Sequence, residues 1–167
     1  MIELQLHENW QLCDIKKQDW IPAQVPGDIY SALLKAEKMP DPFFGDNEYQ
    51  AKALMEEDYE YRTVFTYDEK QFENCQEVIL RFDGIDTIAD VYLNGEKIGS
   101  ADNMNRVWEY DITDLVAGDA ADTVYQVKVI LHSPTKFIAE EDTKCPVGGS
   151  SDAMPGFPHI RKAACMY

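Results

Sequence analysis

FDGIDTIADVYLNGEKIG, residues 82–99, decides the fold class of this chain. Apolar and polar side chains alternate through residues 89–93, which is the period of a strand with one buried face. Asn94-Gly95 follows directly, and both residue types readily take the positive φ that a tight type I′ turn requires. We therefore expect residues 96–99 to return as an antiparallel strand. Such a hairpin belongs to an antiparallel sheet, whose apolar face needs a second layer to cover it.

Similar strand signals recur on both sides of this hairpin. The clearest are the aromatic alternation of residues 59–67 and the apolar alternation of residues 123–132. Shorter candidates are residues 2–6, 10–13, 77–82 and 106–112. Short strands separated by turns, with nothing typical of a parallel βαβ unit, predict an all-β fold, an antiparallel β-sandwich. We expect residues 1–167 to form one such domain, because this length supplies a sizeable core.

Helix signals are few. Asp28 is a candidate N-cap, because its carboxylate can accept hydrogen bonds from the free N–H groups of a first helical turn. The helix that follows it should end near Met39, just before a proline. Residues 51–57 are a candidate for a short helical segment, and residues 134–142 for a single helical turn. The sandwich is thus expected to carry one or two short helices.

The chain carries a formal net charge of −16. A field of this sign repels phosphate groups, so nucleic acid and anionic membranes are not expected as partners. No stretch has transmembrane length, and residues 1–11 lack the basic start and apolar run of a signal peptide. The four cysteines include no Cys-x-x-Cys pair, so we expect free thiols, no zinc or redox site, and a cytoplasmic location. Residues 161–167 end without a cap or a polar tail, which predicts a cut through a longer chain.

No catalytic group is predicted within this chain. The clusters Glu56-Glu57-Asp58 and Glu140-Glu141-Asp142 contain the carboxylates that glycoside hydrolysis uses, but sequence neighbours on a loop rarely face one another across a substrate. We interpret both as solvated charges, with a calcium site as the weaker alternative. His7, His132 and His159 are too scattered for metal-ligand spacing. We therefore expect no metal and no cofactor, and we expect the tryptophans to pack in the core rather than against sugar rings.

Seven short motifs, taken in order, point to one known family. They are VPGDIY (25–30), PDPFFGDNE (40–48), DYEYR (58–62), FDGIDT (82–87), VYLNG (91–95), NMNR (103–106) and PHIRK (158–162). Together they resemble the amino-terminal domain of β-mannosidases of glycoside hydrolase family 2, over roughly residues 10–167. The resemblance implies a jelly-roll sandwich similar to galactose-binding domains. The chain departs from the family near Ala53-Leu54 and at Tyr59, where tryptophan is usual, and at Asn105, where an aromatic residue is usual.

The resemblance also implies a function. The parent enzyme would remove β-linked mannose from non-reducing ends with retention, using two carboxylates about 5 Å apart on a later (β/α)8 barrel. This segment would pack beside that barrel and form one wall of the pocket for a mannose-containing oligosaccharide. In the family, a Gly-Trp-Asp-Trp-Gly-Pro run that touches the sugar follows the Arg-Lys stretch. Arg161, Lys162 and Tyr167 precede that position and are the candidate substrate-binding residues.

Two other functions remain open at this point. The first is a self-sufficient carbohydrate-binding module, since jelly rolls of this type often bind glycans alone. The sequence argues against a module, because it has no evident platform of exposed aromatic residues. The second is a plain protein-interaction domain. In each case, whether accessory domain, binding module or interaction domain, the segment is expected to lack catalytic groups of its own.

Overall fold

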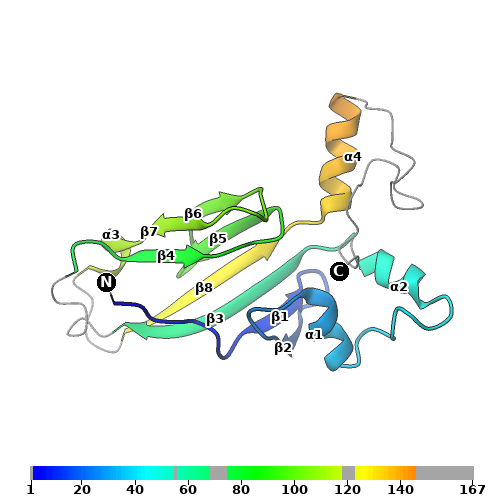
Figure 1. Cartoon of the computed structure of the whole chain (residues 1–167), viewed down its shortest axis with the longest axis horizontal. Coiled ribbons are helices and arrows are strands. Elements are labelled where there is room, and N and C mark those ends of the chain that lie inside the picture. Colours follow the sequence, from blue (N-terminus) through cyan, green and yellow to red (C-terminus); the bar gives the residue numbers. More distant parts are fainter. Residues whose placement is uncertain (1, 55, 68–74, 118–122, 146–167) are drawn as a thin grey trace.

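The computed structural model describes residues 2–54, 56–67, 75–117 and 123–145. The strands in these residues form two antiparallel sheets, so the predicted all-β sandwich is confirmed (Figure 1). The larger sheet has the strand order β2-β1-β3-β8-β5-β6, and the smaller pairs β4 with β7. The strands are Gln11–Asp14 (β1), Asp19–Pro22 (β2), Tyr59–Tyr67 (β3), Ile79–Phe82 (β4), Ala89–Leu93 (β5), Glu96–Ala101 (β6), Trp108–Asp111 (β7) and Thr123–Leu131 (β8).

The hairpin of β5 and β6 has the predicted turn. Asn94 and Gly95 have φ values of 49° and 86°, and β5 and β6 pair antiparallel on either side of them. Asn94 also fastens the turn to β8, because its N–H donates to the carbonyl of Gln126 at 2.9 Å. Its side-chain Oδ1 accepts from the N–H of Gln126 at 2.8 Å. The turn residue therefore extends the ladder of the sheet as well as reversing the chain.

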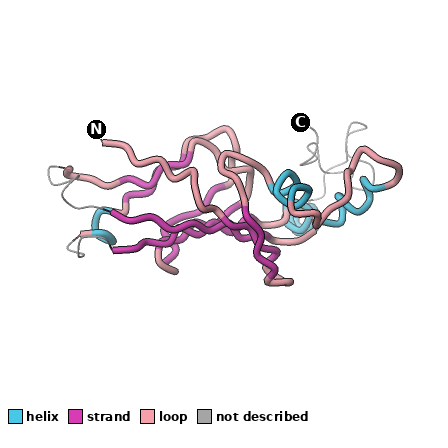
Figure 2. The backbone as a smooth tube through the Cα atoms, turned by 90° about the horizontal axis from the view of Figure 1, so that it is seen from below, coloured by secondary structure: helices cyan, strands magenta, loops and turns pink. Residues whose placement is uncertain are grey.

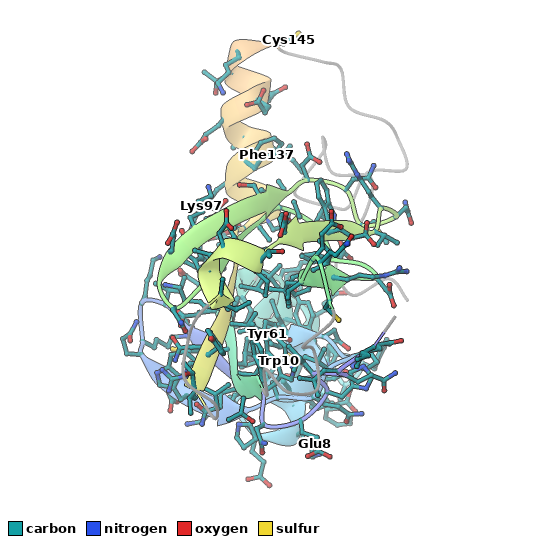
Figure 3. All side chains as sticks on the ribbon, turned by 90° about the vertical axis from the view of Figure 1, so that its left-hand side faces the viewer. Glu8, Trp10, Tyr61, Lys97, Phe137 and Cys145 are labelled. Carbon is teal, nitrogen blue, oxygen red and sulfur yellow. The ribbon has the colours of Figure 1, made fainter. Side chains whose placement is uncertain are left out.

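The core lies between the two sheets. Leu12, Val91, Tyr125 and Val127, from three strands of the larger sheet, have no exposed surface. Leu80 of β4 is also buried and belongs to the same cluster. Aromatic rings complete the packing: Trp10 lies edge-on to Tyr61 with centroids 6.4 Å apart (Figure 3). Alternation along each strand thus places one apolar face inward, as the period-2 pattern predicted.

The smaller sheet contacts β6 through the ring of Tyr110. A Cβ atom added to Gly99 would lie 2.1 Å from Cε1 of that ring, so only glycine leaves room for it. The ring is held from two other sides, because it packs edge-on against Phe82 at 6.1 Å between centroids. In addition, the Tyr110 hydroxyl donates to the carbonyl of Ser100 at 3.1 Å. Gly99 is therefore a contact point between the two sheets.

Replacing Gly99 with alanine is expected to destabilise the domain by about 1–2 kcal/mol, because the methyl group forces a fixed ring out of a packed position. Guanidinium unfolding followed by circular dichroism measures the loss. The double variant Gly99→Ala/Tyr110→Leu should recover part of it, since leucine is shorter than tyrosine. A Gly99→Ala protein as stable as the parent would show that Tyr110 is not held by this contact.

Four helices accompany the strands in the described residues, more than the one or two expected. They are α1 (Ile29–Lys35), α2 (Asn47–Leu54), α3 (Thr113–Val116) and α4 (Pro134–Lys144). The predicted cap of α1 is confirmed, because the Asp28 carboxylate accepts from the N–H of Ser31 at 2.8 Å. Helices α1, α2 and α4 gather at one end of the sandwich and α3 lies at the other (Figures 1 and 2). No helix among those described has the length and apolar composition needed to cross a membrane.

Three local predictions are corrected by the structure. The helix predicted to end near Met39 ends at Lys35, with Ala36 as its C-cap. Residues 2–6 are not a strand: Ile2 and Leu4 are about half exposed, and no described strand pairs with them. Side-chain hydrogen bonds hold this segment instead, for example from Trp10 Nε1 to the carbonyl of Leu6 at 2.6 Å. The single turn predicted at residues 134–142 is an eleven-residue helix, α4. Ser133 caps it, and Pro134 fits its first turn because proline has no N–H to satisfy there.

Candidate functional site

The end of the sandwich that carries α1, α2 and α4 is the candidate functional site, and we call it the helical end. The loop between α1 and α2 presents two adjacent phenylalanines to solvent: Phe43 is 91% exposed and Phe44 77%. Tyr49, in the first half of α2, is 64% exposed. Soluble domains rarely leave neighbouring large aromatic side chains so open without a binding role.

The loop that carries these aromatics has a defined conformation. The Asp41 carboxylate accepts from the N–H of Phe43 at 3.0 Å, and the Asp41 carbonyl accepts from the N–H of Phe44 at 3.2 Å. Asn47 Nδ2 donates to the same carbonyl at 2.8 Å. Gly45 allows the turn by taking a φ of 59°, which a residue with a Cβ atom rarely adopts. The exposed rings are thus presented by local hydrogen bonds.

A groove adjoins the exposed aromatics. Its volume is about 540 Å³, and residues of α1, the segment after α1, and α2 line it. The lining residues are Leu34, Glu37, Lys38, Met39, Pro40 and Gln50. Leu34 is itself 43% exposed on the surface of α1, whereas Met39 is buried. The helical end therefore combines protruding rings with a hollow that has both apolar and charged walls.

A smaller cavity of about 220 Å³ lies between the β1–β2 hairpin, α1 and the end of α2. Tyr59 lines it, and burial, followed by the charges of Asp14 and Glu57, raises the pKa of this tyrosine to about 12. Burial also acts to raise the pKa of Asp14, but hydrogen bonds from Lys17 and from the backbone of Lys16 outweigh it and lower the pKa. The ion pair from Lys17 Nζ to Asp14 measures 2.9 Å. The charged groups of this cavity thus satisfy one another.

The base of α4 is tied to the start of β3 by Asp58. Its Oδ1 accepts from the backbone N–H of Ser133 at 2.9 Å and from Lys136 Nζ at 3.2 Å. Ser133 is 2% exposed, so this carboxylate gives its buried N–H a hydrogen-bond acceptor away from water. Beyond this base the side chains of α4 are half-buried or exposed, and the helix projects away from the sheets with Phe137 on its surface (Figure 3). Asp58 therefore fixes the direction in which α4 leaves the sandwich.

Each carboxylate cluster singled out from the sequence has a glutamate that is paired with a lysine. Glu57 lies 2.6 Å from Lys16 Nζ, and Glu141 lies 2.6 Å from Lys144 Nζ. No group of three or more His, Cys, Asp or Glu side chains that could hold a metal ion is found in the residues that the structure describes. The calcium alternative therefore gains no support from this part of the chain. Arg161, Lys162 and Tyr167 lie outside the described residues, so their proximity to a substrate stays a prediction.

The tryptophans and cysteines divide by environment. Trp10 is a core residue as expected, but Trp20 and Trp108 are half-buried and each stacks on an arginine. The Arg62 guanidinium lies 3.4 Å from the ring centroid of Trp20. Cys13, Cys75 and Cys145 are free thiols, as predicted, and Cys165 lies outside the described residues. Burial raises the pKa of Cys13, which keeps this thiol protonated and unreactive.

A second polar cluster surrounds Asp90 on the outer face of β5. Its carboxylate contacts Lys97 Nζ at 2.7 Å, Ser100 Oγ at 2.7 Å and His132 Nε2 at 3.2 Å. Burial acts to raise the pKa of Asp90, but the hydrogen bonds from these three residues outweigh it and lower the pKa to about 2. The cluster joins β5, β6 and the end of β8, and these contacts indicate a structural role.

Acid is therefore expected to weaken the domain through Asp90. A carboxyl group whose pKa is lowered in the folded state stabilises the fold above its unfolded pKa, near 3.8, and this contribution is lost as the pH falls toward about 2. Partial exposure reduces the effect to about 1–2 kcal/mol. Unfolding free energies of the parent and Asp90→Asn, measured from pH 6 to pH 2, should converge as the pH falls. Parallel curves would contradict this role.

The comparisons with known proteins agree with this geometry. Residues 10–167 match the family described as glycosyl hydrolase 2 galactose-binding domain-like. The chain belongs to that family. Its sandwich with few short helices is the fold expected of this domain, and the family confirms the resemblance to glycoside hydrolase family 2 drawn from the sequence motifs.

Individual relatives extend this result. A β-D-mannosidase from Dictyoglomus thermophilum of known structure is 35% identical, with a TM-score of 0.79, over 88% of this chain and 18% of that one. Beta-mannosidase B from Aspergillus terreus is 36% identical over 64% of this chain. A mannosylglycoprotein endo-beta-mannosidase from Lilium longiflorum is 36% identical over 69% of it. The chain spans 12% of the length of each of these two curated relatives.

Proposed function

We propose that this chain is the amino-terminal accessory domain of a longer enzyme, an exo-acting β-mannosidase that retains anomeric configuration. The observation that carries the proposal is the likeness to the Dictyoglomus β-D-mannosidase, which covers 88% of this chain but only 18% of that protein. The lysine pairing of Glu57 and Glu141 is consistent with catalytic carboxylates elsewhere, on a (β/α)8 barrel of the parent chain. The domain would form one wall of the mannose pocket, with Arg161, Lys162 and Tyr167 nearest the sugar.

The exo mode of action is the finer part of this proposal. Several relatives carry the name beta-mannosidase, whereas the Lilium protein is named an endo-beta-mannosidase. An exo-acting enzyme releases mannose from an aryl β-mannoside or from the end of a manno-oligosaccharide, whereas an endo-acting enzyme cleaves an internal linkage. The family resemblance noted in the sequence favours the exo mode.

Hydrolysis of an aryl β-mannoside by the longer protein that carries this segment tests the proposal. We expect turnover with β-mannose as the first product in proton NMR, because retention proceeds by two displacements. The 167-residue chain alone should show no turnover above a heat-treated sample. Release of α-mannose first, or turnover by the purified 167-residue chain, would contradict the proposed division of labour.

A second candidate function is a self-sufficient carbohydrate-binding module. The exposure of Phe43, Phe44 and Tyr49 favours it, because aromatic faces stack on sugar rings. Such a platform was not expected from the sequence. Isothermal titration of the 167-residue chain with mannose and manno-oligosaccharides separates the two functions. Millimolar or tighter binding that is lost in Phe43→Ser/Phe44→Ser would establish the module, and absence of heat at millimolar ligand would leave the accessory domain.

A further inference from the structure

We propose that the helical end is the surface by which this domain docks onto the catalytic domain of its parent chain, with Phe43 and Phe44 inserted into the interface. This inference rests on the proposed function and adds to it the face, the anchoring residues and the chemistry of the partner surface. Three independent features of the helical end support it: its exposed rings, the exposure of helix α4 and its charge.

The exposed rings are the first feature. Large aromatic side chains in fully buried pockets are the usual anchors of protein interfaces. Phe43 and Phe44 are 91% and 77% exposed although hydrogen bonds to Asp41 hold their backbone in place. Pre-ordering of this kind lowers the entropy lost on binding, so the loop suits a surface that is to be covered. The adjoining groove of about 540 Å³ can receive side chains from the partner.

The exposure of helix α4 is the second feature. Isolated helices shorter than about 12–15 residues are marginal in water. Helix α4 has eleven residues, and only Thr135 in its first turn is buried. Phe137, one residue beyond the lysine that pairs with Asp58, remains 44% exposed on its flank. Within the described residues little of α4 is covered, so a further surface would stabilise a helix of this length. It emerges at the same end as the exposed loop (Figures 1 and 2).

The charge of this end identifies the partner surface. Asp41 and Asp46 are exposed around the two phenylalanines, and Glu140 is exposed on α4. Glu48 and Glu141 are also exposed, but they lie near Lys52 and Lys144. A complementary surface has two apolar pockets rimmed by lysine or arginine. A second copy of this chain, with a net charge of −16, is a poor match for an acidic end. A catalytic domain in the same polypeptide fits better, because its tether supplies a high effective concentration.

Hydrogen–deuterium exchange of the 167-residue chain and of the longer parent protein tests the docking face. We expect amides of residues 41–50 and 138–144 to exchange roughly 10-fold or more slowly in the parent protein, because burial and helix stabilisation suppress local opening. Phe43→Ser/Phe44→Ser in the parent protein should return residues 41–50 to the fast rate. The matched control is Val64→Ser/Val124→Ser, which removes two apolar side chains, 50% and 59% exposed, from the two central strands.

Each outcome of this experiment is decisive. Equal exchange in the two proteins at residues 41–50 would overturn the docking face, whether or not the parent hydrolyses mannosides. Protection that increases with the concentration of the 167-residue chain would identify a second copy of this chain, rather than the catalytic domain, as the partner. Protection in a parent protein that cleaves no β-mannoside would support the docking face and contradict the proposed enzyme activity. An equal effect of the control variant would show that the phenylalanines are not anchors.

Discussion

Replacing Tyr125 with alanine is expected to lower the free energy of unfolding by about 3–5 kcal/mol. Tyr125 has no exposed surface and lies on β8, between β3 and β5 in the larger sheet. Its ring stacks on Phe65 with centroids 5.5 Å apart, and truncation leaves a cavity that the paired backbones on both sides cannot collapse to fill. Because a domain of this size is stable by only about 5–15 kcal/mol, the variant should be largely unfolded at moderate denaturant concentrations.

Val124→Ala is the matched control for this prediction. Val124 is the preceding residue on the same strand, but its side chain points to the opposite face and is 59% exposed. Its truncation should change the unfolding free energy by no more than about 0.5 kcal/mol. Urea unfolding followed by tryptophan fluorescence compares the two. A Tyr125→Ala loss below about 1 kcal/mol would mean that the ring is not part of a close-packed core.

The strands and the central turn were predictable because their signals are local. The alternation of residues 59–67 matches β3 from end to end, and positive φ at Asn94 and Gly95 follows from the residue types themselves. The Asp28 cap is a local signal of the same kind. The failure at residues 2–6 shows the limit of such signals, since alternation makes a strand only where another strand offers its hydrogen bonds.

The helical end could be predicted only in part. Ser133-Pro134 is a recognisable helix start, so α4 could have been predicted as a full helix from its capping residues. The exposure of Phe43 and Phe44 could not be predicted, because an irregular loop has no period from which burial can be judged. Nor does any local pattern join Asp58 to Ser133, which are 75 residues apart in the chain. The candidate site depends on these non-local contacts, whereas the individual strands were predicted from local alternation.

Asp58→Ala is expected to lower the free energy of unfolding by about 2–3 kcal/mol. The substitution removes the oxygen that accepts from the buried N–H of Ser133, and it also removes the ion pair with Lys136. The loss should fall on the helical end as well as on global stability. Once its base is released, Thr135 is the one buried residue of α4 within the described part of the chain, so the amides of α4 should exchange at rates close to those of an unfolded peptide. Denaturant unfolding measures the first effect, and hydrogen exchange of residues 134–144 measures the second.

Asp58→Asn separates the hydrogen bond from the charge. Asparagine keeps an oxygen in the Oδ1 position, which can still accept from the N–H of Ser133, but it loses the attraction of Lys136. That ion pair is partly exposed and should contribute less than about 1 kcal/mol. The asparagine variant is therefore expected to retain an ordered α4 and most of the stability. If both variants lost the same amount, the charge of Asp58, rather than its acceptor oxygen, would be what orients α4 at the proposed docking face.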